Sequence, residues 1–395
     1  MTGSAEISMS SPYPEGAFLA LANQWHAKGH LSRMILQARP QQRLASAAGP
    51  LRRLSAIDRL ARGWPILEAA HLIAPELEIG RLIVGRVPSA HLRARYMYVS
   101  AARFDRKARV HIPERAKWHL GMPAASVETF REARSRGIRT ILHAVNAHPL
   151  AQNDLLLRFY ERREVEQELV PTRVVDRILE EVEYSSVVLA PSRLVAAQFS
   201  LHHKAAIAIE HYGVALHTMR PDALSKPDGP LTALYVGQIS RRKGLPFLLE
   251  AVRGLKLELK LAGPLVAPDL IKKLPDNVRY LGTVPQGQVR SLMSSADVFV
   301  LPTIEDACAL VTFEAAAAGV PVITTQNNGA VEIMPIGSFT SVEAGNVLAL
   351  RAAIGEVRRE DIALRQARGR AIRQESQVRD WPAYADAVLR RLTGH

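Results

Sequence analysis

Short apolar runs alternate with helix-like segments along most of the chain, a pattern typical of parallel α/β folds. The clearest example is an apolar run at Val298–Leu301, a helix expected at residues 310–318, and a second apolar run at Val322–Thr325. Gly319 suits the end of that helix and Pro321 prevents its continuation. The three segments predict a βαβ unit. Open α/β sheets bind their ligands at the carboxyl ends of such strands.

The same patterns predict the remaining elements. Strands are expected at residues 7–10, 81–84, 140–142, 186–189, 231–236, 257–261 and 278–281. Helices are expected at residues 17–28, 126–136, 155–183, 193–199, 245–252 and 378–392. The Gly213-Val214 turn and the polar, proline-bearing residues 220–230 indicate a linker. We therefore expect a first domain at residues 1–210, a second at 211–374, and a terminal helix at 375–395.

Length and composition fit a multidomain globular protein without membrane spans. The chain has 395 residues, of which 48% are hydrophobic, with 24 glycines and 24 prolines. It has no apolar run of about 18 residues, and its first residues lack the basic and apolar regions of a signal peptide. Its single cysteine, Cys308, excludes an intrachain disulfide. These features predict a cytoplasmic protein.

The positive charge is concentrated in the first half. The formal net charge is +13 and the pI is about 10.1. Residues 1–205 contain 29 Lys and Arg against 19 Asp and Glu, whereas the remaining residues contain 22 against 19. Such a surface favours nucleic acid, anionic lipid or a lipid diphosphate, although solvated basic faces are an equal explanation. Residues 51–62 alternate arginines and apolar residues at helical spacing, which suits a membrane surface or an ordinary surface helix.

Two loops at strand ends carry charged groups. Asp306, with Glu305 before it, and Glu314 flank the start of the helix at 310, where the backbone N–H groups of Leu310 and Val311 suit a phosphate. Carboxylates accept hydrogen bonds from sugar hydroxyls, although acids there also simply complement the helix dipole. The turn at residues 237–244 carries Arg241, Arg242 and Lys243, which suit a diphosphate. A solvated basic turn is the alternative.

With the basic turn preceding the acidic motif along the chain, the two motifs resemble those of the retaining GT-B glycosyltransferases, the "glycosyl transferases group 1" family. The resemblance consists of two acids, Asp306 and Glu314, separated by seven residues and followed by alanines and Gly-Val-Pro-Val-Ile. Lys243 matches the lysine of a V-G-R-x-x-x-x-K-G pattern in which Gln238 replaces the arginine. Residues 307–309, Ala-Cys-Ala, stand where the family has Gly-Phe-Gly.

The resemblance implies two Rossmann-like domains facing a cleft, with a C-terminal helix crossing back to the first domain. It implies transfer of a sugar with retention from a UDP- or GDP-sugar to a glycan or lipid-linked acceptor, in the synthesis of cell-surface polysaccharide or glycolipid. Lys243 with Arg242 or Gln238 would stabilise the departing diphosphate, Glu314 would hold the ribose, and Asp306 or Glu305 the sugar hydroxyls. Further donor-binding residues are expected at Gly16, Gly237, Gly263, Val284, Leu310 and Val311, and His148 is expected beside the donor sugar.

The sequence has no D-x-D pair, so we expect no metal and no cofactor, and peripheral association with an anionic membrane through the basic first domain. Two alternatives stay open. One is a sugar-nucleotide epimerase on the same architecture, because fold does not fix function. The other is a basic membrane-binding or nucleic-acid-binding protein that has lost catalysis. No recognised nucleic-acid module is present, so no nucleic-acid partner is expected.

Overall fold

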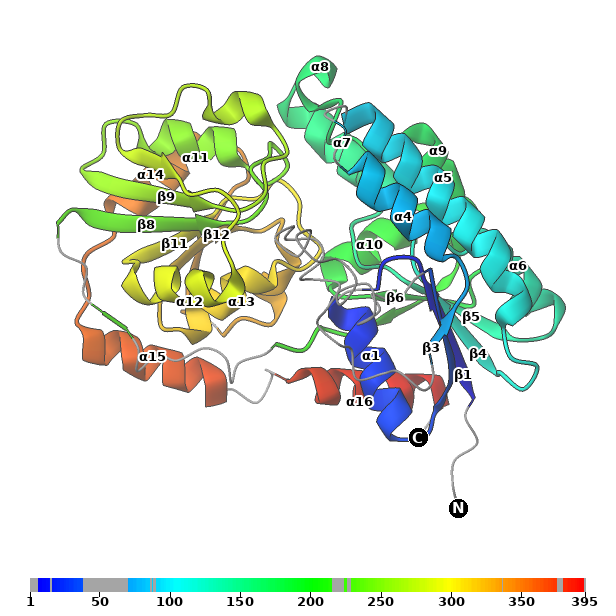
Figure 1. The fold of residues 1–395 in the computed structure, drawn as a ribbon. Coiled ribbons are helices and arrows are strands. Elements are labelled where there is room, and N and C mark those ends of the chain that lie inside the picture. The colour runs from blue at the N-terminus through cyan, green and yellow to red at the C-terminus, as the bar shows by residue number, and fades with distance from the viewer. Residues whose placement is uncertain are drawn as a thin grey trace, which may run out of the picture.

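The computed structural model describes residues 6–14, 16–37, 70–85, 87, 90–214, 224–225, 229–335, 337–374 and 379–393. The basic stretch at 51–62 and most of the predicted linker lie outside these residues. Within the described part, two parallel sheets form two α/β units that lie side by side (Figure 1). No helix of the described residues is long and apolar enough to cross a bilayer.

The N-terminal unit contains a seven-stranded sheet in the order β3-β2-β1-β4-β5-β6-β7, with every neighbouring pair parallel. Its strands are β1 (Ile7–Ser11), β2 (Leu31–Leu36), β3 (Ala70–Leu72), β4 (Trp118–Gly121), β5 (Arg139–His143), β6 (Val187–Ala190) and β7 (Ala206–Ile209). Its helices are α1 (Gly16–Ala27), α4 (Pro75–Val84), α5 (Ala90–Ala108), α6 (Val127–Ser135), α7 (Pro149–Phe159), α8 (Arg162–Val165), α9 (Thr172–Glu183) and α10 (Arg193–His202).

The C-terminal unit contains a six-stranded parallel sheet in the order β10-β9-β8-β11-β12-β13. Its strands are β8 (Leu231–Val236), β9 (Leu257–Ala262), β10 (Val278–Tyr280), β11 (Val298–Leu301), β12 (Val322–Thr325) and β13 (Phe339–Val342). Its helices are α11 (Leu245–Val252), α12 (Gln286–Ser295), α13 (Leu310–Ala317), α14 (Val347–Gly355) and α15 (Ile362–Gln374). Helices α11 and α14 cover one face of the sheet, and α12 and α13 cover the other (Figure 1).

Alternating side chains divide the N-terminal core between the two faces of its sheet. Ile141 of β5 packs in the cluster that contains α1, whereas Leu142 packs in the cluster that contains Phe130 of α6. The last helix, α16 (Trp381–Thr393), returns from the C-terminal unit and joins the first of these clusters. Tyr384 of α16 is fully buried there, and the Trp25 indole donates to the Ala385 carbonyl at 3.0 Å. The predicted C-terminal crossing helix is thus confirmed.

The predicted elements of the C-terminal half match the structure closely, but two predictions in the first half are wrong. Residues 81–84 are the last turn of α4, not a strand, and Ile79 and Ile83, one turn apart, are both exposed on this helix. The apolar run there belongs to an amphipathic helix, and the sheet edge is formed by β3 instead. The helix expected at 155–183 is divided into α7, α8 and α9, with Pro171 immediately before α9.

The apolar pattern of the first strand, β1, is weak because two of its residues are serines that face a buried histidine. Ser8 and Ser10 of β1 lie 2.8 and 3.0 Å from the two ring nitrogens of His119 on β4. Burial lowers the pKa of His119 to about 3 and the pKa of His143 to about 4. Both histidines are therefore neutral in the folded protein at neutral pH.

The lowered pKa values of these two histidines predict that the protein loses stability in mild acid. The unfolded chain binds a proton at each histidine near pH 6.5, whereas the folded chain does not until about pH 3 or 4. The free energy of unfolding should therefore decrease as the pH falls from 6.5 towards 4, by about 1.4 kcal/mol per pH unit for each histidine. In His119→Gln this dependence should be shallower by about that amount, as urea unfolding at a series of pH values will measure. An unchanged slope would contradict the assignment of His119.

Candidate active site

The turn after β8 packs directly on the loop after β11, at the carboxyl edge of the C-terminal sheet. The Arg242 carbonyl accepts hydrogen bonds from the Ile304 N–H at 2.9 Å and from the Thr303 hydroxyl at 3.1 Å. Gly244 has a φ of +71°, and a Cβ at this position would overlap the Pro302 carbonyl oxygen. Only glycine fits here, and its close approach brings the basic turn against the acidic loop.

Two ion pairs join the basic turn to the acidic loop. The Lys243 ammonium contacts the Asp306 carboxylate, and the Arg242 guanidinium lies 3.1 Å from the Glu305 carboxylate. The Gln238 amide oxygen accepts a further hydrogen bond from Arg242 at 3.3 Å. The structure thus brings Gln238, Arg242 and Lys243 together with Glu305 and Asp306, more than sixty positions further along the sequence.

Burial controls the electrostatics of this cluster. Lys243 is 8% exposed and Glu305 is 1% exposed. Burial lowers the pKa of Lys243, opposed mainly by the Asp306 carboxylate. Burial raises the pKa of Glu305, opposed mainly by the Arg242 guanidinium. Each charge is therefore stabilised mainly by its partner rather than by water.

The two carboxylates differ in their unused capacity for hydrogen bonds. Both oxygens of Asp306 are engaged, one by Lys243 and the other by the Cys308 N–H at 3.2 Å. The buried Oε1 of Glu305 has no hydrogen-bond partner within the described residues. A buried acceptor without a donor costs about 1–3 kcal/mol, which a ligand hydroxyl would recover. Glu305, considered at first only as a substitute for Asp306, is thus the better placed acceptor.

The neighbouring turns pack backbone against backbone. Gly263, at the end of β9, has a φ of +143°, and a Cβ there would overlap the Gly237 carbonyl. The Gly237 N–H donates to the Ala262 carbonyl at 3.0 Å, and the Gly263 N–H donates to the Gly282 carbonyl at 2.8 Å. Val284, two residues further, packs partly buried against the C-terminal core. Gly237 and Gly263, two of the predicted donor-binding glycines, therefore lie together at the sheet edge beside the basic turn.

The start of α13 differs from the prediction. The Leu310 N–H donates to the Cys308 carbonyl at 2.9 Å, so it is not free for a phosphate here. Val311 follows it in the first turn of α13. Glu314 lies one turn further, and the first turn contains no acid, which disfavours the alternative that Glu314 only complements the helix dipole. Burial raises the pKa of Glu314, opposed by Arg290 on α12.

His148 and Gly16 lie in the N-terminal unit and have no contact with the ion pairs. The buried ring of His148 stacks on His202, with ring centroids 4.4 Å apart, and its Nε2 lies 3.0 Å from His203. Gly16 begins α1 with a φ of +48°, and a Cβ there would meet no atom within 4 Å. Asn146 and Ala147 of the same loop line a cavity that Arg242 also lines.

A cavity of about 300 Å³ lies between the loop after β5 and the basic turn. Arg242 lines the cavity from the C-terminal unit, and the other lining residues come from the N-terminal unit. They are Pro123, Ala124, Asn146, Ala147, Pro149, Gln152, Val170, Val174, Ile178 and Phe199. The amides of Asn146 and Gln152 supply polar groups in an otherwise largely apolar wall.

Two carboxylates connect the units on either side of this cavity, and sequence analysis missed both. Glu168, which follows α8, accepts the N–H groups of Arg241 and Arg242 at 2.8 and 2.9 Å. Glu332 of the C-terminal unit accepts the N–H groups of Arg193 and Leu194 at 2.7 and 2.9 Å, at the start of α10. Neither glutamate belongs to a motif, so their pairing is visible only in three dimensions.

Comparison with known proteins identifies the C-terminal half. Residues 220–374 match the family described as "Glycosyl transferases group 1". These residues belong to that family. The resemblance inferred from the motifs around Lys243 and Asp306 is thereby confirmed.

Individual relatives of this glycosyltransferase family match only part of the chain. A putative colanic acid biosynthesis glycosyltransferase, WcaL, of Salmonella typhimurium is 29% identical over 175 residues, which cover 39% of this chain and 43% of WcaL. Glycogen synthase of Mycobacterium tuberculosis is 31% identical over 183 residues, which cover 42% of this chain and 44% of that protein. The chain thus spans less than half the length of either relative.

Solved structures confirm the predicted GT-B fold. Sucrose-phosphate synthase from Thermosynechococcus elongatus superposes with a TM-score of 0.69 at 16% identity, covering 98% of this chain and 99% of that one. Anabaena Alr3699/HepE in complex with UDP and glucose superposes with a TM-score of 0.60 at 14% identity, covering 99% of this chain and 100% of that one. The chain has two Rossmann-like domains facing an inter-domain cleft.

The segment that departs from the glycosyltransferase signature, residues 307–309, forms part of the domain interface. Ala307 packs in the N-terminal cluster around Phe199, and its carbonyl accepts a hydrogen bond from the Ser192 hydroxyl at 3.0 Å. Cys308 packs against the cluster that contains Tyr384. The small side chains of this segment therefore lie where the two domains meet.

The loop after β4 lines the cavity and is held by a buried carboxylate. Glu181 of α9 accepts the N–H groups of Ala124 and Ser126, each at 2.7 Å. Ala124 has a φ of +66°, which is uncommon for a residue with a side chain. The unusual backbone thus depends on Glu181, which no sequence motif indicates.

We expect Glu181→Gln to destabilise the protein by about 1–2 kcal/mol, because one of the two buried N–H groups would lose its acceptor. Urea unfolding measures this change. The neighbouring Glu180 forms only a surface ion pair with Arg131 at 2.6 Å, so Glu180→Gln should cost less than about 1 kcal/mol. Equal effects of the two substitutions would show that Glu181 does not support the loop.

Proposed function

We propose that this chain is a glycosyltransferase that moves a sugar, with retention at the anomeric carbon, from a nucleotide-diphosphate-sugar to a glycan or lipid-linked acceptor. The observation that carries the proposal is the buried pairing of Lys243 and Arg242 with Asp306 and Glu305 at the carboxyl edge of the C-terminal sheet. The family of residues 220–374 supports it, as does the likeness to HepE, whose solved structure contains UDP and glucose.

In this proposal the two cations act on the leaving group. Negative charge grows on the diphosphate as its bond to the sugar breaks, and cations held in place beforehand lower the energy of that transition state. The diphosphate takes over Lys243 and Arg242 from their carboxylate partners. Asp306 and Glu305 are then free to accept hydrogen bonds from the sugar hydroxyls. The buried and unsatisfied Oε1 of Glu305 favours this exchange.

The remaining donor contacts follow the sheet edge. The proposal places the ribose at Glu314 and the base against the turns at Gly263 and Val284. Gly16 and His148 keep their proposed places on the side of the transferred sugar, although the His148 ring must turn away from His202 to reach it. The leaving phosphate accepts the proton of the attacking acceptor hydroxyl, so retention needs no side-chain nucleophile.

The proposal assigns the neutralisation of the diphosphate to Lys243 and Arg242 rather than to a metal ion or another cofactor. We therefore expect turnover in excess chelator to stay within about twofold of its value in untreated enzyme, because two cations already oppose the developing charge. The measurement compares initial rates with and without the chelator. Complete loss of turnover, restored by a divalent cation, would refute metal independence.

The proposed setting is cell-surface polysaccharide or glycolipid synthesis at the inner face of a membrane. The relatives include proteins named for the biosynthesis of colanic acid and of teichuronic acid. The net charge of +13 favours peripheral attachment to anionic lipid.

Thermal unfolding with a panel of UDP- and GDP-sugars tests the proposed function. A ligand at 100 times its dissociation constant adds about 2.7 kcal/mol of stability, which raises the unfolding temperature measurably. With the sugar that stabilises the protein, release of free nucleotide should depend on an added acceptor. Conversion of the sugar without any acceptor would instead indicate an epimerase. Salt-dependent DNA binding without nucleotide-sugar affinity would indicate a protein that has lost catalysis.

A further inference from the structure

A second cavity, of about 440 Å³, lies on the N-terminal domain between α5 and the start of α9. Its walls are mostly apolar and include Ala94 and Tyr98 of α5, together with Pro171 and Val174. This volume lies within the range of about 300–1,000 Å³ typical of small-molecule sites. We call this cavity the α5–α9 groove.

The two helices that form the groove are fixed to each other. The Arg177 guanidinium of α9 contacts the Asp105 carboxylate of α5, and both side chains are buried or nearly so. Asp105 also accepts the N–H groups of Glu128 and Thr129 at 2.8 and 2.9 Å, at the start of α6. The groove therefore exists before any ligand arrives, which reduces the entropic cost of binding.

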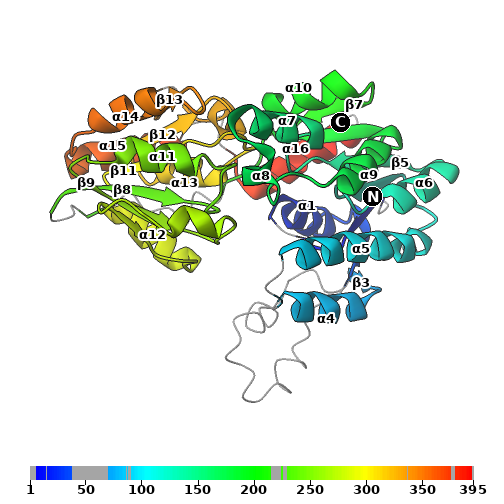
Figure 2. The same cartoon turned by 90° about the horizontal axis from the view of Figure 1, so that it is seen from above.

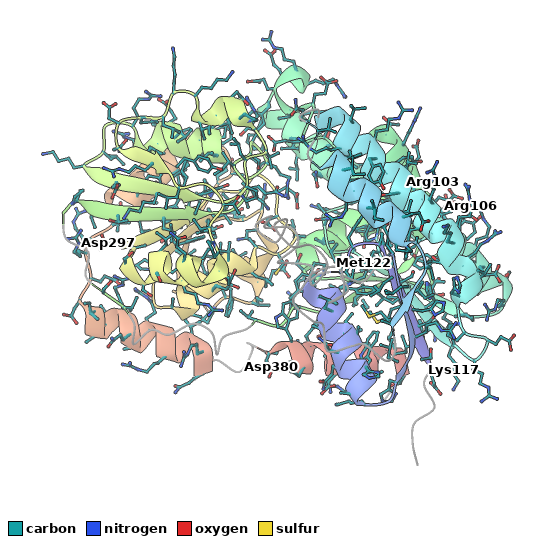
Figure 3. All side chains as sticks on the ribbon, in the orientation of Figure 1. Arg103, Arg106, Lys117, Met122, Asp297 and Asp380 are labelled. Carbon is teal, nitrogen blue, oxygen red and sulfur yellow. The ribbon has the colours of Figure 1, made fainter. Side chains whose placement is uncertain are left out.

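Cations border the apolar walls. Arg95 and Arg173 line the groove and are exposed, and neither has an ion-pair partner among the residues that the structure describes. Asp176, one turn along α9 from Arg173, forms no ion pair with it. Arg103 and Arg106 lie further along α5 (Figure 3), also exposed and without an ion pair in the described chain. An apolar groove with unpaired guanidinium groups fits a ligand with an apolar chain and an anionic phosphate.

The groove leads towards the active site. Val174 lines both the α5–α9 groove and the 300 Å³ cavity that contains Arg242. A ligand held in the groove would therefore extend its far end past Val174, towards Asn146, Gln152 and the basic turn. The helices that form the groove lie together on the N-terminal domain, with α4 outermost beside α5 (Figure 2).

We propose that the α5–α9 groove binds the lipid end of the acceptor, and that the acceptor is a glycan linked through phosphate to an apolar lipid chain. The chain lies against Ala94, Tyr98 and Pro171, the phosphate contacts Arg95 and Arg173, and the sugar occupies the cavity beyond Val174. This inference rests on the proposed function and narrows its acceptor class. A basic surface alone would bind any polyanion, whereas the apolar groove beside it selects a lipid.

Calorimetric titration with farnesyl phosphate and with isopentenyl phosphate, which has the same phosphate on a shorter chain, tests the proposal on the full chain. The intact protein should bind farnesyl phosphate at least about tenfold more tightly than isopentenyl phosphate, because only the longer chain fills the apolar walls. Arg95→Ala combined with Arg173→Ala should weaken the binding of farnesyl phosphate about tenfold or more. The matched control, Arg103→Ala combined with Arg106→Ala, removes the same charge from α5 outside the groove and should change it less than about twofold.

A variant that fills the groove without changing its charge tests whether the apolar walls contribute to binding. Ala94 is exposed, so Ala94→Trp should fold normally and weaken farnesyl phosphate binding while changing isopentenyl phosphate binding less than about twofold. Equal affinity of the intact protein for both probes, or equal losses in the two arginine pairs, would overturn the inference.

The same variants are also tested for stabilisation by the nucleotide-sugar. Donor binding without farnesyl phosphate binding would reject the groove and keep the proposed function. Farnesyl phosphate binding at the groove without any donor binding would reject the proposed function and keep the lipid site.

Discussion

Lys243→Ala is expected to lower turnover by about two to three orders of magnitude, the usual cost of losing one group that stabilises transition-state charge. Lys243 is almost completely buried and lies against Asp306, so its ammonium is held in position before the donor binds. The loss should appear mainly in kcat, because the negative charge on the leaving diphosphate is greatest in the transition state. Initial rates at saturating donor measure it.

The control is Lys273→Ala, which removes an exposed lysine from the same domain. Its turnover should stay within about twofold of that of the intact enzyme. Because Lys243→Ala also leaves Asp306 without its cation, urea unfolding is measured alongside. A Lys243→Ala variant that is folded and nearly as active as the intact enzyme would remove Lys243 from its proposed role.

Gly244→Ala is expected to destabilise the protein by about 3 kcal/mol or more. The φ of +71° alone costs a residue with a Cβ about 1–2 kcal/mol, and the Cβ would overlap the Pro302 carbonyl oxygen. Relief of that overlap moves the basic turn away from the acidic loop. Affinity for a nucleoside diphosphate should therefore fall together with the free energy of unfolding, as calorimetry and urea unfolding measure.

Gly254→Ala is the matched control for backbone strain. Gly254 has a φ of +73°, and a Cβ at this position would meet no atom within 4 Å. Its substitution should cost only the strain of about 1–2 kcal/mol and leave nucleotide binding unchanged. Equal destabilisation by both substitutions would mean that the turn and the loop are not held in contact at Gly244.

Sequence reasoning located the second sheet and its charged loops because their signals are local. The strands at 231–236, 298–301 and 322–325 are short apolar runs bounded by glycine or proline, and the structure confirms them residue for residue. Lys243 and Asp306 could be assigned to one sheet edge because loops that follow parallel strands meet there. The resemblance assigned both loops to one donor site, but the ion pairs between them were not predicted.

Sequence patterns failed to predict features that depend on contacts between residues distant in the chain. Glu168, Glu181 and Glu332 bind backbone N–H groups distant in sequence, so no local pattern marks them. Residues 81–84 were predicted as a strand because the short apolar run at 82–84 fits a buried strand as well as one turn of an amphipathic helix. The roles of His148 and Gly16 came from the resemblance alone and stay predictions.

Calorimetric titration of the intact protein and of Lys243→Ala with UDP and GDP is the most direct test of the central claim, that the basic turn binds the diphosphate of a sugar donor. We expect one of the two nucleotides to bind the intact protein, and Lys243→Ala to weaken it at least about tenfold while Lys273→Ala does not. Equal affinity in the intact protein and Lys243→Ala, or no binding of either nucleotide, would contradict the account.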